Sequence, residues 1–128
     1  GLVPALEWLV RVMSEQQAFT INLHHQVDNN LASDIQTLVF RVVQEALTNA
    51  IKHAKASLIT INVIATKSML MVKVKDNGQG MELQPDDLTT GFGLGAMRDR
   101  VMAYGGQLTV TTAPQQGCEI KVLVTGNN

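Results

Sequence analysis

Apolar residues follow a helical spacing in three parts of the chain. At its start, Leu2, Leu6 and Leu9 recur at intervals of three or four residues, which is the spacing of one helix face. The same spacing extends from about Asp34 to Ala54 and returns between Ala96 and Tyr104. These segments are predicted to be three amphipathic helices.

Alternation of apolar and polar residues marks the predicted strands. Ala18 to Leu23 alternates in this way, and two β-branched runs follow the long helix, Leu58 to Ala65 and Met69 to Lys75. Only a short segment separates those two runs, which predicts a hairpin. The chain closes with two further alternating runs, Gln107 to Thr112 and Cys118 to Val124, on either side of a turn.

The predicted order is helix, strand, helix, two strands, helix and two strands. Helices mixed with adjacent antiparallel strands are typical of a two-layer α/β sandwich, an α/β fold of the α+β kind. Ser33 stands where the second helix begins and is predicted to cap it. Residues 81–90 carry Pro85 and no periodicity, and are predicted to form a loop. A chain of 128 residues with this one succession fits a single domain, residues 1–128.

Composition narrows the possible functions. The net charge of −1, with basic residues that form no run, argues against a nucleic-acid-binding surface, which needs a positive field. One cysteine excludes an internal disulfide framework, and one cysteine with three histidines at unrelated spacings gives no recognisable zinc site. No run approaches the roughly 20 apolar residues of a membrane helix. These features favour a cytoplasmic domain that contacts neither membrane nor nucleic acid directly.

Polar residues of the long helix recur three or four residues apart and share one face: Arg41, Glu45, Thr48, Asn49 and Lys52. The amide oxygen of Asn49 is a suitable ligand for magnesium, and Glu45, one turn earlier, can order a water molecule or accept a proton. Lys52 offers a positive charge to phosphate. Such a stripe is also the ordinary solvent-facing side of a surface helix, so on its own it does not decide between the two interpretations.

A short polar sequence, Asp76-Asn77-Gly78-Gln79-Gly80, directly follows a predicted strand. Its glycines let the backbone approach a flat ligand. An ionised Asp76 can accept a hydrogen bond from an exocyclic amine such as that of adenine. Asp-Asn-Gly is also strong turn chemistry, so a plain strand-ending turn is the alternative interpretation.

Alternating glycines open the third predicted helix, in the sequence Gly91-Phe92-Gly93-Leu94-Gly95. Free backbone N–H groups and the helix dipole make such a start a place for phosphate oxygens. The pattern differs from the dinucleotide-binding G-x-G-x-x-G, and no G-K-[ST] follows it as in a P-loop. Ordinary helix capping is the alternative here.

In order and spacing, the three motifs resemble the N, G1 and G2 boxes of the superfamily of histidine kinases, gyrase, heat-shock chaperones and mismatch-repair ATPases, over about Leu38 to Val124. The segment from Phe40 to Ala54, with Gln-Glu-Ala before Asn49 and Lys-His-Ala after it, is similar to the N box of nitrate and hexose-phosphate sensor kinases. The run Met97-Arg98-Asp99-Arg100 resembles the G2 region of the same subfamily. The hexose-phosphate sensor type is closest in appearance.

The resemblance implies a role for each matching residue. Asn49 is expected to ligate Mg²⁺, Glu45 to act as the catalytic residue in phosphoryl transfer, and Asp76 to read adenine. The other implied nucleotide-binding residues are Lys52, His53, Gly78, Gly80, Met81, Gly91, Phe92, Gly93, Leu94 and Gly95, with a flexible lid over about residues 81–92. Many relatives carry threonine at the position of Cys118, so Cys118 either contacts the base or only packs beneath it.

The implied fold is the Bergerat-type ATP-binding fold, in which helices cover one face of a mixed, largely antiparallel sheet. The implied activity is that of a protein histidine kinase, which binds Mg-ATP and donates the γ-phosphate to a histidine on a separate dimerisation domain, for relay to a response regulator. His24, His25 and His53 lack the Glu-Leu-His-Asp setting of that acceptor. The acceptor and sensor domains are therefore expected elsewhere in a membrane-anchored, homodimeric parent, and the fragment alone is expected to be monomeric and not to autophosphorylate.

Three alternatives stay open on the sequence alone. A degenerate relative would sense nucleotide and dock partners without phosphoryl transfer, although Glu45 and Asn49 are both present. An anti-sigma-type kinase or a gyrase-type clamp belongs to the same superfamily, and the short chain disfavours the clamp. An unrelated α/β domain with coincidental turns is the last alternative.

Overall fold

The computed structural model of the chain describes residues 1–15, 19–80 and 93–125. Helices and strands follow one another in the order that the sequence predicts, and one π-helical turn extends the second helix. Their bounds are α1 Leu2–Ser14, β1 Thr20–Val27, α2 Ser33–Asn49, the π-helical turn η1 Ala50–Ala54, β2 Leu58–Ala65, β3 Met69–Asp76, α3 Leu94–Ala103, β4 Gln107–Thr112 and β5 Cys118–Thr125.

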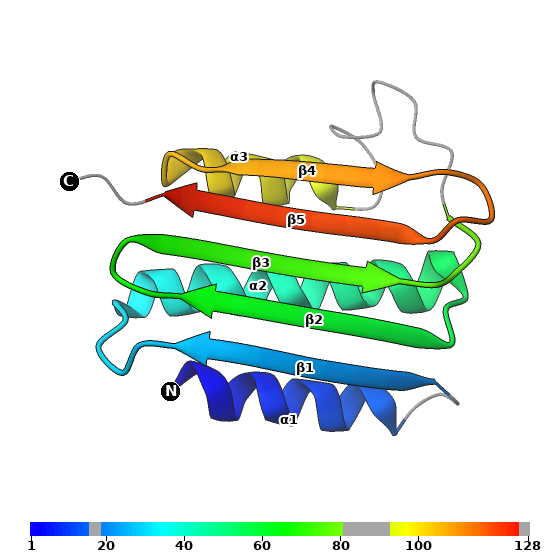
Figure 1. The fold of residues 1–128 in the computed structure, drawn as a ribbon, viewed down its shortest axis with the longest axis horizontal. Helices are drawn as coiled ribbons and strands as arrows, with labels where there is room; N and C mark the ends of the chain where they lie inside the picture. Colours follow the sequence, from blue (N-terminus) through cyan, green and yellow to red (C-terminus); the bar gives the residue numbers. More distant parts are fainter. Residues whose placement is uncertain (16–18, 81–92, 126–128) are drawn as a thin grey trace.

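The strands form one five-stranded sheet in the order β1-β2-β3-β5-β4. β1 runs parallel to β2, and the other neighbouring pairs are antiparallel. A parallel pair needs a long crossover, which α2 supplies between β1 and β2. Figure 1 shows α1, α2 and α3 behind the same face of the sheet. The predicted two-layer sandwich with a mixed, largely antiparallel sheet is confirmed.

The core lies between the helices and the covered face of the sheet. Every second residue of β2 is buried, including Ile59, Ile61 and Val63, and the same alternation continues in β3. These side chains belong to one buried cluster with Val43 and Leu47 of α2. Each fully buried side chain of this size contributes roughly 1.5–3 kcal/mol relative to an exposed one, so this layer holds the sheet against the long helix.

Three predicted boundaries are corrected. Ser33 is the first residue of α2 instead of its cap, and the N-cap is Ala32, which makes no side-chain capping bond. The first strand is Thr20–Val27 instead of 18–23, because its parallel pairing with β2 continues as far as Val27 and Ala65. The third helix begins at Leu94, two residues earlier than predicted, since Gly93 precedes it in a left-handed conformation.

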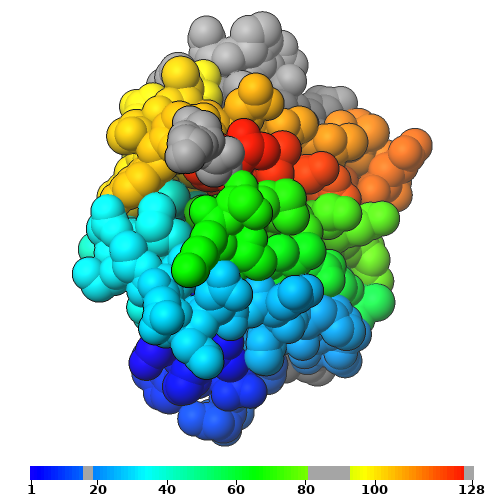
Figure 2. Space-filling model, turned by 60° about the vertical axis from the view of Figure 1, so that its left-hand side comes forward, coloured from blue at the N-terminus to red at the C-terminus, as the bar shows by residue number. Residues whose placement is uncertain are grey.

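A cavity of about 540 Å³ lies at the end of the sheet where α2 begins, between the β1–α2 loop and the β2–β3 turn. Figure 2 shows the start of α2 (cyan) beside that turn (green). This end is remote from the ends of α2 and β3, where the first two sequence motifs lie (Figure 1). Among the helices that the structure describes, none combines the length and apolar character needed to cross a bilayer.

Candidate functional site

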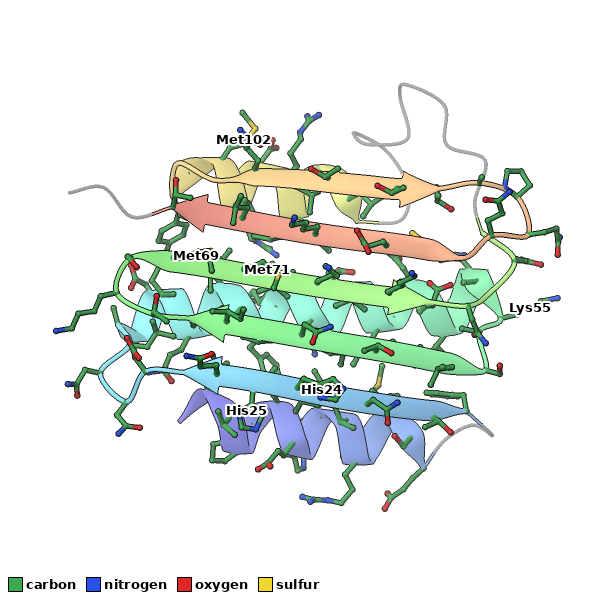
Figure 3. All side chains as sticks on the ribbon, in the orientation of Figure 1. His24, His25, Lys55, Met69, Met71 and Met102 are labelled. Carbon is green, nitrogen blue, oxygen red and sulfur yellow. The ribbon has the colours of Figure 1, made fainter. Side chains whose placement is uncertain are left out.

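The long helix changes its geometry in the middle of the first motif. It is α-helical only to Asn49 and continues as the π-helical turn η1, where an uninterrupted helix to Ala54 was predicted. Lys55 then ends the helix in a left-handed conformation, with φ 52° and ψ 45°, and Figure 3 labels this residue. Short π-helical segments inside helices occur frequently at functional sites. Here the turn carries Lys52 and His53, whose side chains are both exposed.

Two polar side chains are buried in the part of the chain that the structure describes, and both belong to the predicted motifs. Asn49 is 5% exposed and Asp76 is 7% exposed. Burying a polar group costs free energy unless it is hydrogen-bonded, so a buried polar residue points to a structural or functional role more strongly than an exposed one does. Glu45, one turn before Asn49, is half-buried, whereas Arg41 is exposed. Thr48 donates its hydroxyl to the carbonyl oxygen of Gln44 at 2.9 Å and so serves its own helix.

Asp76 is the last residue of β3 and pairs with Cys118, the first residue of β5. Its Oδ1 accepts a hydrogen bond from the backbone N–H of Gly78 at 2.8 Å. Burial raises the pKa of the Asp76 carboxyl, and hydrogen bonds from the backbone of Gly78 and Cys118 oppose that rise. The carboxyl group is therefore oriented by the backbone before any ligand arrives.

The turn after Asp76 packs tightly against η1. A Cβ atom on Gly78 would overlap the carbonyl oxygen of Ala54, so no larger residue fits there without a shift. Gly80 is buried and has φ +73°, with the backbone of Ala113 in the space that a side chain would need. The second motif thus lies between the end of the first motif and the β4–β5 turn.

The described part of the third motif, Gly93 to Gly95, lies against the middle of the first motif. Gly93 has φ +70°, and a Cβ atom on it would lie 3.0 Å from Oε2 of Glu45. Leu94 and Gly95 follow it and are buried at the start of α3. This helix has no side-chain cap and no acidic residue in its first turn, so its N-terminal dipole is not neutralised by its own residues.

The structure therefore brings together Glu45, Asn49, Asp76, Gly78 and Gly93 from three distant parts of the sequence. The predicted site residues Met81, Gly91 and Phe92, and the predicted lid over residues 81–92, lie outside the described residues.

Cys118 packs in the core next to Asp76, with 5% of its surface exposed. Burial, and then the nearby negative charge of Asp76, raise the pKa of its thiol to about 11. The thiol is consequently protonated at neutral pH. Cys118 is as buried as Asn49, so its burial does not distinguish between the two roles that the sequence left open for it.

Two residues that sequence reasoning did not single out also shape the site. The Oδ1 atom of Asn77 accepts hydrogen bonds from the backbone N–H groups of Ser57 and Leu58, at 3.0 and 2.9 Å. The Nε2 atom of Gln79 donates to the carbonyl oxygen of His53 at 2.8 Å. The turn-forming character of Asn-Gly was a signal for Asn77. No signal marked Gln79, because its partner is a backbone carbonyl.

The histidines outside the three motifs belong to no metal-binding cluster among the described residues. His24 and His25 are exposed on the edge strand β1 (Figure 3). Within residues 1–15, 19–80 and 93–125, no group of three or more His, Cys, Asp or Glu side chains is arranged to hold a metal ion.

Residues 34–126 match the family described as histidine kinase-, DNA gyrase B- and HSP90-like ATPases. The signal transduction histidine-protein kinase/phosphatase DegS of Brevibacillus brevis is 34% identical over 97% of this chain and 32% of its own length. UhpB of Salmonella typhimurium, with the same description, is 38% identical over 86% of this chain and 22% of its own length. The chain thus spans about a third or less of these curated relatives, and the predicted subfamily is compatible with them.

Solved structures share the fold. The ATP-binding domain of PrrB from Mycobacterium tuberculosis superposes with a TM-score of 0.74 at 16% identity, over 98% of this chain and 93% of that one. The histidine kinase domain of the Erythrobacter litoralis blue-light activated kinase EL346 gives a TM-score of 0.77 at 21% identity, over 97% and 60% of the two chains. At these identities the likeness speaks for the fold alone.

Proposed function

Because the chain belongs to the family of histidine kinase-, DNA gyrase B- and HSP90-like ATPases, we propose that it is the ATP-binding catalytic domain of a sensor histidine kinase. In this proposal it binds Mg-ATP and presents the γ-phosphate to a histidine on a separate dimerisation domain. The observation that carries the proposal is the position of the two buried polar side chains, Asn49 and Asp76. Each stands at the place in its motif where the family resemblance implies a nucleotide contact.

The residues present fit the nucleotide. Asp76 is oriented by the backbone N–H of Gly78 and can accept a hydrogen bond from the adenine amine. Asn49 offers an amide oxygen to Mg²⁺, which when bound neutralises charge on the phosphates. The start of α3 at Gly93 offers backbone N–H groups to the phosphates, and Lys52 offers a positive charge.

In this proposal Glu45 assists phosphoryl transfer and contributes little to nucleotide affinity. It lies against Gly93, so its carboxylate is close to the proposed phosphate end of the site. A carboxylate there can orient the incoming imidazole or accept its proton. Positioning and charge neutralisation then supply most of the rate enhancement, as is general for phosphoryl transfer.

The finer features follow from the same proposal. Residues 1–128 act as one catalytic domain, residues 81–92 act as its lid, and the acceptor histidine comes from the dimerisation domain of a homodimeric parent. A response regulator receives the phosphate afterwards. The domain works in the cytoplasm, and the parent kinase is anchored in the membrane.

Calorimetric titration with a non-hydrolysable ATP analogue, with and without Mg²⁺, tests the binding step. Asn49→Asp is expected to change the Mg²⁺ dependence more than the recognition of adenine. The matched control is Asn62→Asp, which changes a half-buried asparagine of β2 outside the three motifs. A wild-type chain that binds no adenine nucleotide would refute the proposal.

The transfer step is tested by mixing the chain with a dimerisation domain from a homologous kinase and radiolabelled ATP. Glu45→Gln is expected to slow transfer at least tenfold and to leave nucleotide affinity within about twofold, because general acid–base groups contribute roughly 10²–10⁴ to rate. Equal transfer rates in the wild type and Glu45→Gln would remove the chemical role of Glu45. They would leave open only a nucleotide-binding or docking role for that residue.

A further inference from the structure

One residue supplies hydrogen bonds to both carbonyl oxygens at the end of η1. The backbone N–H of Gln79 donates to the carbonyl oxygen of Ala54 at 2.7 Å. Its side-chain Nε2 donates to the carbonyl oxygen of His53 at 2.8 Å. The last carbonyls of a helix have no partner within the helix, so they need one from outside. Gln79 provides it from the turn that follows Asp76.

Gln79 is held in place independently of its side chain. Its carbonyl oxygen accepts a hydrogen bond from the backbone N–H of Gln115, and the preceding carbonyl, of Gly78, accepts one from Gly117 at 3.1 Å. The backbone of Gln79 therefore spans from η1 to the β4–β5 turn. Removing only the side-chain amide should leave these backbone hydrogen bonds intact.

We propose that Gln79 is a positioning residue for the phosphate end of the nucleotide. Its side-chain amide fixes the His53 peptide, and through it the orientation of Lys52 and His53. This inference rests on the proposed function, in which Lys52 contacts phosphate. The side chain of Lys52 is exposed, so the backbone of the turn sets the direction in which it leaves the helix.

The adenine end of the site is held by other contacts. Asp76 is oriented by the backbone N–H of Gly78, which does not involve the Gln79 side chain. Loss of the Gln79 amide is therefore expected to weaken phosphate contacts and to spare adenine recognition. Gln79→Met, which keeps the length of the side chain and removes the donor, should weaken binding of the ATP analogue about three- to tenfold, as for the loss of one hydrogen bond. Binding of adenosine should be unchanged.

Gln116→Met is the matched control. Gln116 is also an exposed glutamine near the site, and its side chain makes no hydrogen bond with any described residue. This variant should bind both ligands like the wild type. An equal loss of ATP-analogue and adenosine affinity in Gln79→Met would indicate general damage and would overturn the proposal.

A double-mutant cycle with Lys52→Met tests whether Gln79 acts through Lys52. In the Lys52→Met background, Gln79→Met should have almost no further effect on ATP-analogue affinity, because the contact that it orients is already gone. Fully additive losses would mean that the two residues act separately. That result would contradict the positioning role.

A measurement without nucleotide separates this inference from the proposed function. Hydrogen exchange of the backbone amides in η1 and Lys55 should be faster in Gln79→Met than in the wild type or in Gln116→Met. If the wild type binds no ATP analogue but exchange is faster, the proposed function fails while the link between Gln79 and η1 stands. Unchanged exchange in Gln79→Met would overturn the inference whatever the nucleotide affinities are.

Discussion

Gly93 stands directly against Glu45, with Oε2 of the glutamate 3.0 Å from the place where a Cβ atom on Gly93 would be. The backbone of Gly93 is also left-handed, at φ +70°. The conformation therefore favours glycine, and a side chain at this position would require the Glu45 carboxylate to shift. This contact is the point at which the first and third motifs meet.

Gly93→Ala should combine two penalties. The left-handed backbone costs a non-glycine residue roughly 1–2 kcal/mol of stability, and the new methyl group should displace the Glu45 carboxylate. We expect this loss in urea unfolding, together with at least tenfold slower transfer in the reconstituted kinase. Gly105→Ala is the control, because Gly105 has φ +76° and no atom within 4 Å of its Cβ position. Gly105→Ala should lose similar stability and transfer normally, and equally slow transfer in both variants would contradict a role for the contact with Glu45.

Asp76→Asn should separate stability from function. Burial raises the pKa of the Asp76 carboxyl in the folded chain. Because the pKa is higher in the folded chain than in the unfolded chain, the folded chain binds more protons between these two pKa values. The contribution of Asp76 to stability is therefore present below the ordinary carboxyl pKa and is lost as pH rises through the raised pKa. Asp76→Asn should remove that pH dependence and keep or increase the Tm at neutral pH. It should also lower ATP affinity more than tenfold, because an amide donor would then face the adenine amine.

The measurements for Asp76→Asn are thermal unfolding between pH 4 and 8 and calorimetric titration with the ATP analogue. Asn77→Asp is a useful comparison, since it changes the neighbouring side chain, which points to Ser57 instead of toward Gly78. Unchanged ATP affinity in Asp76→Asn would exclude the adenine contact.

Cys118 should react slowly with iodoacetamide in the folded chain. Its pKa of about 11 leaves little thiolate at pH 8, and an ordinary cysteine with a pKa near 8.5 carries on the order of a hundred times more. The rate should rise as pH approaches 11, and it should also rise in Asp76→Asn, which removes the second-largest cause of the shift. Mass spectrometry of alkylated protein, with the urea-unfolded chain as reference, measures both effects. Equal rates in folded and unfolded protein would contradict the burial of this thiol.

Asn77→Ala should destabilise the chain by about 1–3 kcal/mol. The Asn77 side chain accepts hydrogen bonds from two backbone N–H groups and donates one to Oγ of Ser57 at 2.9 Å, and a hydrogen bond contributes roughly 0.5–1.5 kcal/mol. Asn77→Asp keeps the acceptor and should lose less. Urea unfolding gives the comparison. If Asn77→Asp is as unstable as Asn77→Ala, the two accepted hydrogen bonds are not what holds this turn.

Strong periodicity made most of the fold predictable. The spacing of Leu38, Val42 and Ala46 placed the long helix, and the alternation in Leu58 to Ala65 placed a central strand with its bounds as observed. The turn η1 was not predictable, because α- and π-helical segments are built from the same residue types and differ only in which carbonyl each N–H reaches. The parallel pairing of β1 with β2 depends on where α2 packs, which no local pattern reveals.

The parts of the candidate site that depend on the chemical type of a side chain could be predicted from the sequence. Asn49, Asp76 and Gly93 were predicted from residue type and spacing, and the structure places them in neighbouring segments. Gln79 could not be found in the same way. It bonds to a backbone carbonyl, a group that every residue carries, so the interaction exists only once the chain has folded.

The edge position of β1 has a consequence for local unfolding of the chain. Among the described strands, β1 pairs with β2 alone, and α1 packs on α2 and β1. Every proposed ligand contact, by contrast, comes from α2 or later in the chain. We therefore expect α1 and β1 to open at a lower free energy than the central strands, which would appear as faster hydrogen exchange of the β1 amides than of those in β3.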